Sequence, residues 1–157
     1  MDIVFDSLDG SCKIKIVSNV VELLNSYRQI RLFNKEAGGL LICRESIESG
    51  NIIVEFATEP YNGDVRKRYR FYRRDIKHIE EFNRLYSQHR GIYGYFGEWH
   101  THPEKYPCYS WIDKDNWEKI ATHDDNIEKI YYHVIVGTES ICVWAYNSKK
   151  KVLKKVY

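Results

Sequence analysis

The sequence predicts an α/β fold in which helices cover a β-sheet. Segments with the two-residue alternation of strands are interspersed with segments whose apolar residues recur at helical spacing. The chain has 157 residues and no internal repeat or linker-like stretch, so one domain over residues 1–157 is expected. Its 13 Tyr, 6 Phe and 4 Trp supply the large side chains that a packed core requires.

The first half of the chain is predicted to form one helix and a group of strands. The expected strands span residues 12–17, 38–43 and 52–56. A turn around Gly50 joins the last two of them. Asn19 and Glu22 have the spacing of a capping box, so a helix is expected to begin at Asn19. The apolar stripe of this helix comprises Val20, Leu23, Leu24 and Tyr27.

The second half continues this alternation. Residues 65–72 alternate basic and aromatic side chains, which indicates a strand or an extended arm. Asp75 is expected to cap a helix that ends near Gly91. The inward residues of that helix are predicted to be Ile76, Ile79, Phe82 and Tyr86. A strand is expected over 93–100, followed by a helix over 114–122 whose buried side comprises Trp117, Ile120 and Ala121. The chain is expected to finish with a hairpin over 131–136 and 141–146 and a solvated Lys-rich end over 149–155.

One pattern, H-x-H-P-x6-S-x2-D, contains His100, His102, Ser110 and Asp113. Residues two apart on a strand face the same way, so the two imidazoles are expected to lie side by side. Pro103 cannot continue a central β-ladder, and the loop after it is long enough to bring Asp113 back to the histidines. Two imidazoles and a carboxylate leave the fourth position of a zinc ion open for water, which is typical of a catalytic site.

These residues also have structural interpretations. Ser110 and Asp113 match the S-x-x-D capping box, and a single strand histidine is more often a core or surface residue than a ligand. The joint spacing favours the metal site, and a residue at a helix start can cap the helix and still face a substrate. Other zinc patterns fail, because H-E-x-x-H is missing and Trp111 stands where a nucleobase deaminase has its second cysteine.

The string Gly97-Glu98-Trp99-His100-Thr101-His102-Pro103, with Ser110 and Asp113 after it, resembles the JAMM motif of zinc-dependent isopeptidases, also called JAB or MPN-plus. The upstream string Glu36-Ala37-Gly38-Gly39-Leu40-Leu41 resembles the E-x-x-G-x-L segment of that family. The resemblance implies a three-layer sandwich, similar to cytidine deaminases, in which helices flank a mixed, curved β-sheet.

The resemblance also implies a role for each residue. The ligands of one zinc ion per chain would be His100, His102 and Asp113. Glu36 would deprotonate the attacking water and then protonate the leaving amine. Ser110 would donate a hydrogen bond to the oxyanion, worth about 2.7–4 kcal/mol by analogy with other oxyanion holes. Glu98 is a second candidate base because it shares the strand face of the histidines, although a salt bridge is the expected role for it.

The compact chain is similar to bacterial JAB peptidases that are encoded with ubiquitin-like conjugation enzymes in anti-phage operons, including CBASS. This similarity implies hydrolysis after the C-terminus of a ubiquitin-like protein or of a CBASS cGAS-like synthase, either to remove conjugates or to process precursors. The conjugation enzymes of the same operon would be further partners. The alternatives are a peptidase acting on small peptides or cysteine adducts, and a binding module that keeps the fold without turnover.

Six basic residues form the strongest charge cluster: Arg66, Lys67, Arg68, Arg70, Arg73 and Arg74. Three interpretations are open for it. They are recognition of an acidic protein surface, a solvated strand face, and nucleic-acid binding through the interleaved aromatic rings. The net charge of only +2 disfavours nucleic acid as a partner.

The composition also bears on the cellular setting. No apolar run approaches the roughly 20 residues of a membrane span, and the acidic start lacks the features of a signal peptide. The four cysteines are widely spaced and are expected to be reduced, with Cys108 a passive thiol near the metal site. A cytoplasmic protein without membrane or nucleic-acid partners is therefore expected.

Overall fold

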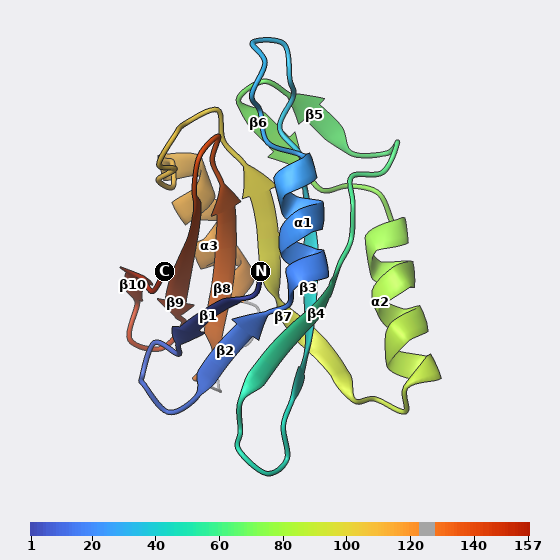
Figure 1. The fold of residues 1–157 in the computed structure, drawn as a ribbon, viewed down its shortest axis with the longest axis vertical. Helices are drawn as coiled ribbons and strands as arrows, with labels where there is room; N and C mark the ends of the chain where they lie inside the picture. The colour runs from blue at the N-terminus through green and yellow to red at the C-terminus, as the bar shows by residue number, and fades with distance from the viewer. Residues whose placement is uncertain (123–127) are drawn as a thin grey trace.

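The computed structural model describes residues 1–122 and 128–157 (Figure 1). This part of the chain contains ten strands and three helices. The strands are β1 (Ile3–Asp6), β2 (Lys13–Ile16), β3 (Gly38–Glu45), β4 (Ile52–Ala57), β5 (Val65–Lys67), β6 (Arg70–Tyr72), β7 (Tyr93–Thr101), β8 (Ile130–Val136), β9 (Ile141–Asn147) and β10 (Val152–Lys155). The helices are α1 (Ser18–Ser26), α2 (Lys77–Gln88) and α3 (Trp111–Ala121).

Eight strands form one mixed sheet in the order β1-β2-β4-β3-β7-β8-β9-β10. β2 pairs with β4, and β7 with β8, in parallel, whereas the other neighbours are antiparallel. β3 and β7 are the two central strands, so the motif histidines lie on a strand that is hydrogen-bonded on both sides. β5 and β6 form a separate hairpin above one end of this sheet (Figure 1).

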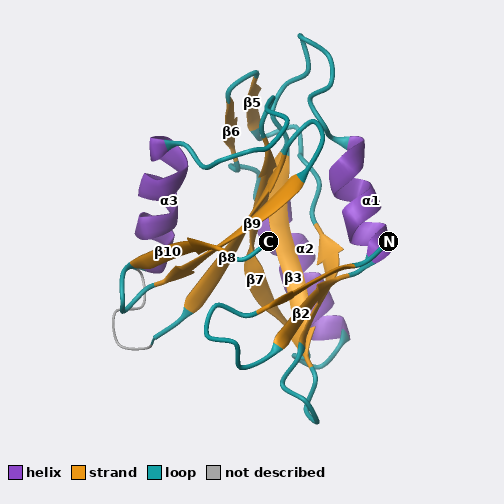
Figure 2. Ribbon diagram, turned by 60° about the vertical axis from the view of Figure 1, so that its left-hand side comes forward, coloured by secondary structure: helices purple, strands orange, loops and turns teal. Residues whose placement is uncertain are grey.

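Helices α1 and α3 cover opposite faces of β7. The ring of Trp99 lies 5.6 Å from that of Tyr27 at the end of α1, whereas the ring of the adjacent His100 lies 6.5 Å from that of Trp117 on α3. Since successive strand residues point to opposite faces, the sheet is a layer between the two helices, as Figure 2 shows. α2 packs against β3 and β7. The predicted α/β sandwich with a mixed sheet is confirmed.

The main hydrophobic core lies between α1 and the sheet. Its buried residues include Val20 and Leu24 of α1, Leu41 of β3, Phe96 of β7 and Val134 of β8. Each fully buried side chain of this size contributes about 1.5–3 kcal/mol. β7 approaches β8 so closely that a Cβ added at Gly97 would lie 1.7 Å from the Tyr132 carbonyl oxygen. This close approach explains why a glycine stands three residues before His100.

Most of the predicted elements are confirmed, with shifted ends. Gly50 lies in the turn between β3 and β4 with a left-handed φ of 66°, and Gly91 follows α2 with a φ of 76°. The 65–72 segment is a hairpin and not a single strand, because the chain reverses at residues 68–69 and Val65 pairs with Tyr72.

The capping box predicted at Asn19 and Glu22 is wrong. α1 begins at Ser18, and its N-cap residue, Val17, forms no side-chain hydrogen bond. Instead, the N–H of Ser18 donates to Asp2 Oδ1 at 2.8 Å. A carboxylate from just before β1 therefore satisfies a free donor of the first turn, and local spacing cannot reveal such a long-range contact.

The predicted inward face of α2 is also wrong. The exposed fractions of the expected residues are 63% for Ile76, 39% for Ile79 and 50% for Tyr86, and Phe82 is half-buried. His78 and Leu85 are buried instead. The helix turns His78 inward because its ring nitrogens bond to Asp64 at 2.8 Å and to Thr58 at 2.6 Å. As expected, Asp75 lies at the helix start, where its Oδ1 accepts the N–H of Lys77.

Both ends of the chain form strands that the pattern analysis did not identify. β1 pairs with β2, and β10 pairs with β9 at the other edge of the sheet. Most side chains of the Lys-rich 149–155 run are exposed, as expected, but its last four residues are ordered as β10. Lysines on an edge strand deter pairing with another sheet.

Candidate functional site

β7 brings both motif histidines to the end of a central strand. His100 lies opposite Ile135 of β8, and the N–H of His102 donates to the Val136 carbonyl at 3.0 Å, one residue beyond the strand. Pro103 follows, and the ladder stops there as predicted. The two Nε2 atoms lie 3.0 Å apart, so the imidazoles face each other.

The loop between β7 and α3 is fixed against the turn that joins β8 and β9. The Glu104 carbonyl accepts the Thr138 N–H at 2.6 Å, and the Lys105 carbonyl accepts the Ser140 N–H at 3.1 Å. The Glu104 carboxylate also accepts the N–H of Cys108, an exposed free thiol, at 3.2 Å. These bonds turn the chain back toward the sheet, so that α3 begins beside the histidines.

Ser110 and Asp113 form the capping box of α3. Ser110 Oγ accepts the Asp113 N–H at 3.2 Å, and Asp113 Oδ2 accepts the N–H and the hydroxyl of Ser110 at 2.6 and 2.7 Å. The structural interpretation of this pair is therefore correct. The same bonds hold the Asp113 side chain in one orientation, in which its carboxylate points at the two histidines.

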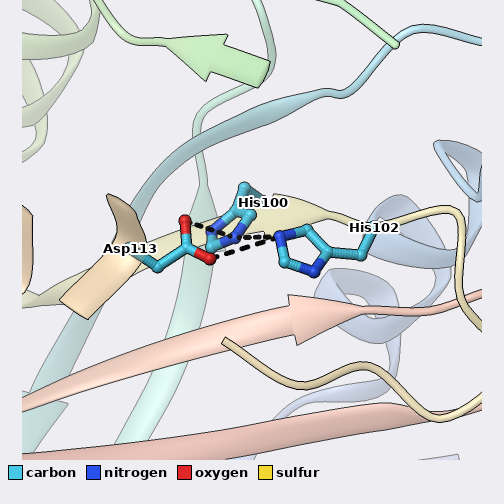
Figure 3. A group of neighbouring side chains, drawn as sticks. All are labelled: His100, His102 and Asp113. Atoms are coloured by element: carbon cyan, nitrogen blue, oxygen red, sulfur yellow. Dashed lines mark hydrogen bonds and ion pairs between the residues drawn. The ribbon is translucent and has the colours of Figure 1, made fainter. Parts of the chain in front are cut away.

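His100, His102 and Asp113 converge on one point and are called the His-His-Asp group below (Figure 3). The Nε2 atom of His100 lies 3.3 Å from Asp113 Oδ1, and that of His102 lies 3.4 Å from Oδ2. A tetrahedral zinc ion with bonds of about 2.0–2.1 Å separates its ligand atoms by about 3.3–3.4 Å. The two His–Asp separations, each to a different carboxylate oxygen, are close to this spacing, and the His–His distance is slightly shorter, so the group fits a zinc ion.

The charges in this group favour a bound cation. Burial alone would raise the pKa of Asp113, but His100, His102 and Ser110 outweigh burial and hold it well below its usual range. Burial lowers the pKa of His102, but the hydrogen bond and charge of Asp113 raise it overall. An ionised carboxylate beside two nitrogen atoms that face the same point creates a site of negative potential.

The backbone of Glu36, just before β3, is held between the hairpin and the end of β7. Its N–H donates to the Lys67 carbonyl, and its carbonyl accepts from Arg66 Nε, both at 2.8 Å. The next residue, Ala37, donates its N–H to Thr101 Oγ1 at 3.0 Å and accepts the Thr101 N–H at 2.9 Å. Glu36 is thereby fixed beside the strand that carries the histidines.

The two candidate bases differ in their surroundings. Glu36 is 5% exposed, and burial raises the pKa of its carboxyl to about 8, although the charge of His102 opposes that rise. A carboxyl with a pKa near neutrality can both accept and donate a proton. Glu98 Oε1 instead accepts from Arg73 Nε and Nη2 at 3.1 and 2.8 Å, which confirms the salt bridge expected for it.

All five predicted site residues line one pocket of about 440 Å³. The walls also include Tyr69, Arg70, Phe71 and Tyr72 of the hairpin and Ile112, Asn116 and Ile120 of α3. These wall residues were not predicted from the sequence to belong to the site. Asn116 follows Asp113 by three residues and Ile120 by seven, so helical spacing could have found them. The alternation of basic and aromatic residues predicted a strand or an extended arm over 65–72, but not the reversal that places residues 69–72 in the pocket wall.

Residues 23–147 match the family model described as prokaryotic homologs of the JAB domain. The chain belongs to this family. Together with its relatives, this membership places the chain among the peptidase-type hydrolases.

Curated relatives support the assignment along most of the chain. An Escherichia coli protein named CD-NTase/cGAS isopeptidase is 40% identical over 145 residues, which cover 91% of this chain and 86% of the relative. A Vibrio cholerae protein of the same name is 34% identical over 119 residues, covering 76% and 75% of the two chains. A third, from Pseudomonas aeruginosa, is 30% identical over 135 residues, covering 86% and 84%.

A solved structure shares the fold. The solution structure of protein DSY2949 from Desulfitobacterium hafniense superposes with a TM-score of 0.54 over 89% of this chain and 87% of the other, at 18% identity. Among the helices that the structure describes, none has the length and apolar character needed to cross a membrane.

Proposed function

We propose that this chain is a zinc-dependent isopeptidase that releases CBASS cGAS-like synthases from the proteins to which their C-termini are conjugated. The convergence of the His-His-Asp group in one pocket with Glu36 carries the proposal. The names of the three relatives support the choice of substrate, and they favour the synthase over a ubiquitin-like protein. Processing of a synthase precursor would use the same chemistry.

In this proposal His100, His102 and Asp113 hold the zinc ion. Zinc in such a site supplies Lewis acidity, which polarises a carbonyl group and makes water a stronger acid. The capping box presets the direction of the Asp113 carboxylate, and the β7–β8 ladder presets the two imidazoles. Little rearrangement is then needed when the site is loaded, which favours both binding and catalysis.

Glu36 is the proposed base. Its carboxylate takes a proton from the attacking water and delivers it to the amine of the leaving group. Burial of this carboxyl and its place in the pocket support that role, while the pairing of Glu98 with Arg73 supports a structural role for the rival. Ser110, at the start of α3, lines the same pocket, and its hydroxyl turns from Asp113 Oδ2 to donate its one hydrogen to the oxyanion that develops on the scissile carbonyl.

The decisive experiment uses a cGAS-like synthase fused through its C-terminus to a carrier protein. Zinc-loaded wild-type protein is expected to cut the fusion at the junction, and Glu36→Gln is expected to lose about 10²–10⁴-fold in kcat while retaining one zinc per chain. Glu98→Gln is the matched control, because it removes a neighbouring carboxylate and leaves Glu36 in place. Equal activity of Glu36→Gln and wild type would exclude Glu36 as the base, and a fusion left intact by zinc-loaded protein would refute the proposed substrate.

A further inference from the structure

Two segments beside the pocket expose a group of large apolar side chains. In the loop between α1 and β3, Ile30, Leu32 and Phe33 are 74%, 78% and 77% exposed. At the tip of the β5–β6 hairpin, Tyr69 is 70% exposed. Figure 1 shows the loop and the hairpin together at the top of the molecule. These four residues are called the apolar rim.

Hydrogen bonds join the two segments into one preformed surface. Arg68 Nη1 donates to the carbonyls of Arg31 and Leu32. Gln29 Nε2 donates to the Asn34 carbonyl at 3.1 Å and to the Arg68 carbonyl at 2.8 Å. Gln29 is itself buried, so these bonds are shielded from water. A surface that is already ordered loses less conformational entropy when a partner binds.

The positive charge of the chain is concentrated on the same segments. Residues 28–37 and 65–74 contain nine of the 24 Lys and Arg residues but only one of the 22 Asp and Glu residues, so the rest of the chain carries a net charge of −6. The single acid, Glu36, is buried. Arg31, Lys35 and Lys67 are exposed and form no ion pair with any residue that the structure describes. Such segregation steers a partner of opposite charge to one face.

The apolar rim and the pocket are continuous, because Tyr69 belongs to both and Arg70, its neighbour, lines the pocket wall. When the C-terminal tail of a substrate enters the pocket past Tyr69 and Arg70, the folded part of that substrate lies over the apolar rim. Two contacts made by one substrate reinforce each other, since the second forms at a high effective concentration. A short peptide can use only the pocket.

We propose that the apolar rim docks the folded body of the conjugated synthase, through an apolar patch bordered by Asp and Glu residues. This inference rests on the proposed function, because it extends recognition of the same substrate beyond its tail. The pocket selects the tail, and the rim and its surrounding cations select the protein to which the tail belongs.

The test compares two substrates of the same tail sequence: the synthase–carrier fusion and a fluorogenic peptide that contains only the synthase tail. For Leu32→Ser/Phe33→Ser and for Arg31→Glu/Lys67→Glu, kcat/KM on the fusion is expected to fall about tenfold or more, the scale of a small hot spot. On the peptide, kcat/KM should change less than about twofold. Matched controls are Ile47→Ser, at a fully exposed apolar residue of the β3–β4 turn, and Lys154→Glu on β10, which should affect neither substrate.

Equal losses on both substrates, or no loss on either, would overturn the docking role and leave the proposed function intact. Failure of the wild type on both substrates would instead count against the proposed function. Docking is then decided by calorimetric titration of Glu36→Gln with the synthase, where Leu32→Ser/Phe33→Ser should weaken binding about tenfold. Unchanged affinity would refute it. Tight binding of a single-stranded oligonucleotide, lost in Arg31→Glu/Lys67→Glu while fusion cleavage is unchanged, would assign the cations to nucleic acid.

Discussion

Among the residues that the structure describes, two groups join histidine, aspartate and a hydroxyl, and they differ in how completely their polar atoms are paired. The first is a buried network of His78, Asp64 and Thr58. Thr58 Oγ1 accepts the Leu40 N–H at 2.8 Å, so it can donate to His78 Nδ1, and a neutral imidazole then donates from Nε2 to Asp64. Every ring nitrogen has a partner, and both side chains of the His78–Asp64 pair are fully buried.

In the His-His-Asp group, by contrast, two imidazole nitrogens face each other and one carboxylate, and the group opens into the pocket. The Nε2 atoms of His100 and His102 and the Asp113 carboxylate point at one place, and among the described residues no other N–H or O–H group lies between the two histidines. A structural network is therefore recognised by complete pairing, and a functional site by lone pairs that converge where a ligand can enter. Residue types alone do not separate the two.

The comparison predicts opposite consequences for substitution of Asp64 and of Asp113. The loss of Asp64 is the largest expected effect on stability. Asp64 accepts from the N–H groups of Tyr61, Arg74 and Asp75 as well as from His78. Asp64→Ala removes the acceptor of all four donors, among them the fully buried His78 ring, and should lower the free energy of unfolding by about 3–5 kcal/mol. Asp113→Ala should cost the metal-free protein only about 1 kcal/mol, from the lost cap, while abolishing cleavage.

Urea unfolding of metal-free samples measures both changes. Asp64→Asn, which keeps the shape and one acceptor oxygen, should lose less than Asp64→Ala. If Asp113→Ala proved the more destabilising variant, the distinction between the fully paired His78–Asp64–Thr58 network (the closed network) and the His-His-Asp group would be wrong.

Zinc binding should also distinguish the two aspartates, through a somewhat smaller change in stability. At a free zinc concentration of 100 Kd the folded state gains about 2.7 kcal/mol. For a chain of this size the gain raises Tm by about 5–10 °C. Wild type and Asp64→Ala should both show the rise, from different starting temperatures, and Asp113→Ala should not. A zinc-dependent rise that persists in Asp113→Ala would place the metal elsewhere. Thermal scans with and without chelator measure these shifts.

The buried Glu36 carboxyl should lower the free energy of unfolding at high pH, whereas the fully paired closed network should not. In the metal-free fold, burial raises the pKa of Glu36 from 4.5 to about 8. A raised carboxyl pKa contributes stability that is fully present below pH 4.5 and is lost as the pH rises to 8, because the folded state must then hold a buried charge. Glu36→Gln should therefore exceed wild type in stability at pH 8 by about 3–4 kcal/mol, and by less than about 1 kcal/mol at pH 5.

Unfolding curves across this pH range, with zinc removed, measure the difference. Zinc should shrink it, because a cation beside Glu36 stabilises the carboxylate. Glu81→Gln is a suitable control, since Arg84 lowers the pKa of that exposed carboxyl and its removal should bring no gain at pH 8. A Glu36→Gln difference that did not grow with pH would show that Glu36 is not held neutral by burial.

The same contrast explains which features could be predicted from the sequence. The motif residues at 100, 102, 110 and 113 are recognisable because their spacing reflects short-range geometry, namely strand alternation, a proline stop and a capping box. Glu36 was predicted only from the resemblance of residues 36–41 to the family's upstream segment. The structure brings all five residues into one pocket. The closed network gave no such signal, because Thr58, Asp64 and His78 follow no local periodicity and meet only through the fold.

Errors in the predicted elements have the same origin. The buried face of α2 was predicted from apolar residues, but the helix instead buries His78, whose partners lie outside it. α1 takes its N-terminal acceptor from Asp2, sixteen residues away. Hydropathy and capping rules use only residues that are close in sequence. They fail where a polar group is satisfied by a distant part of the chain.

Ser110 combines the two kinds of role in one hydroxyl, and its substitution gives the smallest predicted change in stability. Its Oγ caps α3, and in the proposed mechanism the same Oγ donates to the oxyanion. At an N-cap, Ser→Ala costs about 1 kcal/mol, whereas Ser→Gly costs only a few tenths, because glycine leaves the terminal N–H groups open to water. Thermal unfolding should therefore rank wild type first, Ser110→Gly close behind and Ser110→Ala last.

Cleavage of the synthase–carrier fusion should follow a different order. If the hydroxyl stabilises the oxyanion, both Ser110→Gly and Ser110→Ala lose about 10²–10³-fold in kcat, and Ser110→Thr, which keeps a hydroxyl, loses least. If Ser110 acts only as a cap, activity follows stability, and Ser110→Gly, which keeps the bond from its N–H to Asp113 Oδ2, stays near wild type. The glycine variant thus separates the two roles, because it alone keeps a tolerable cap while removing the hydroxyl.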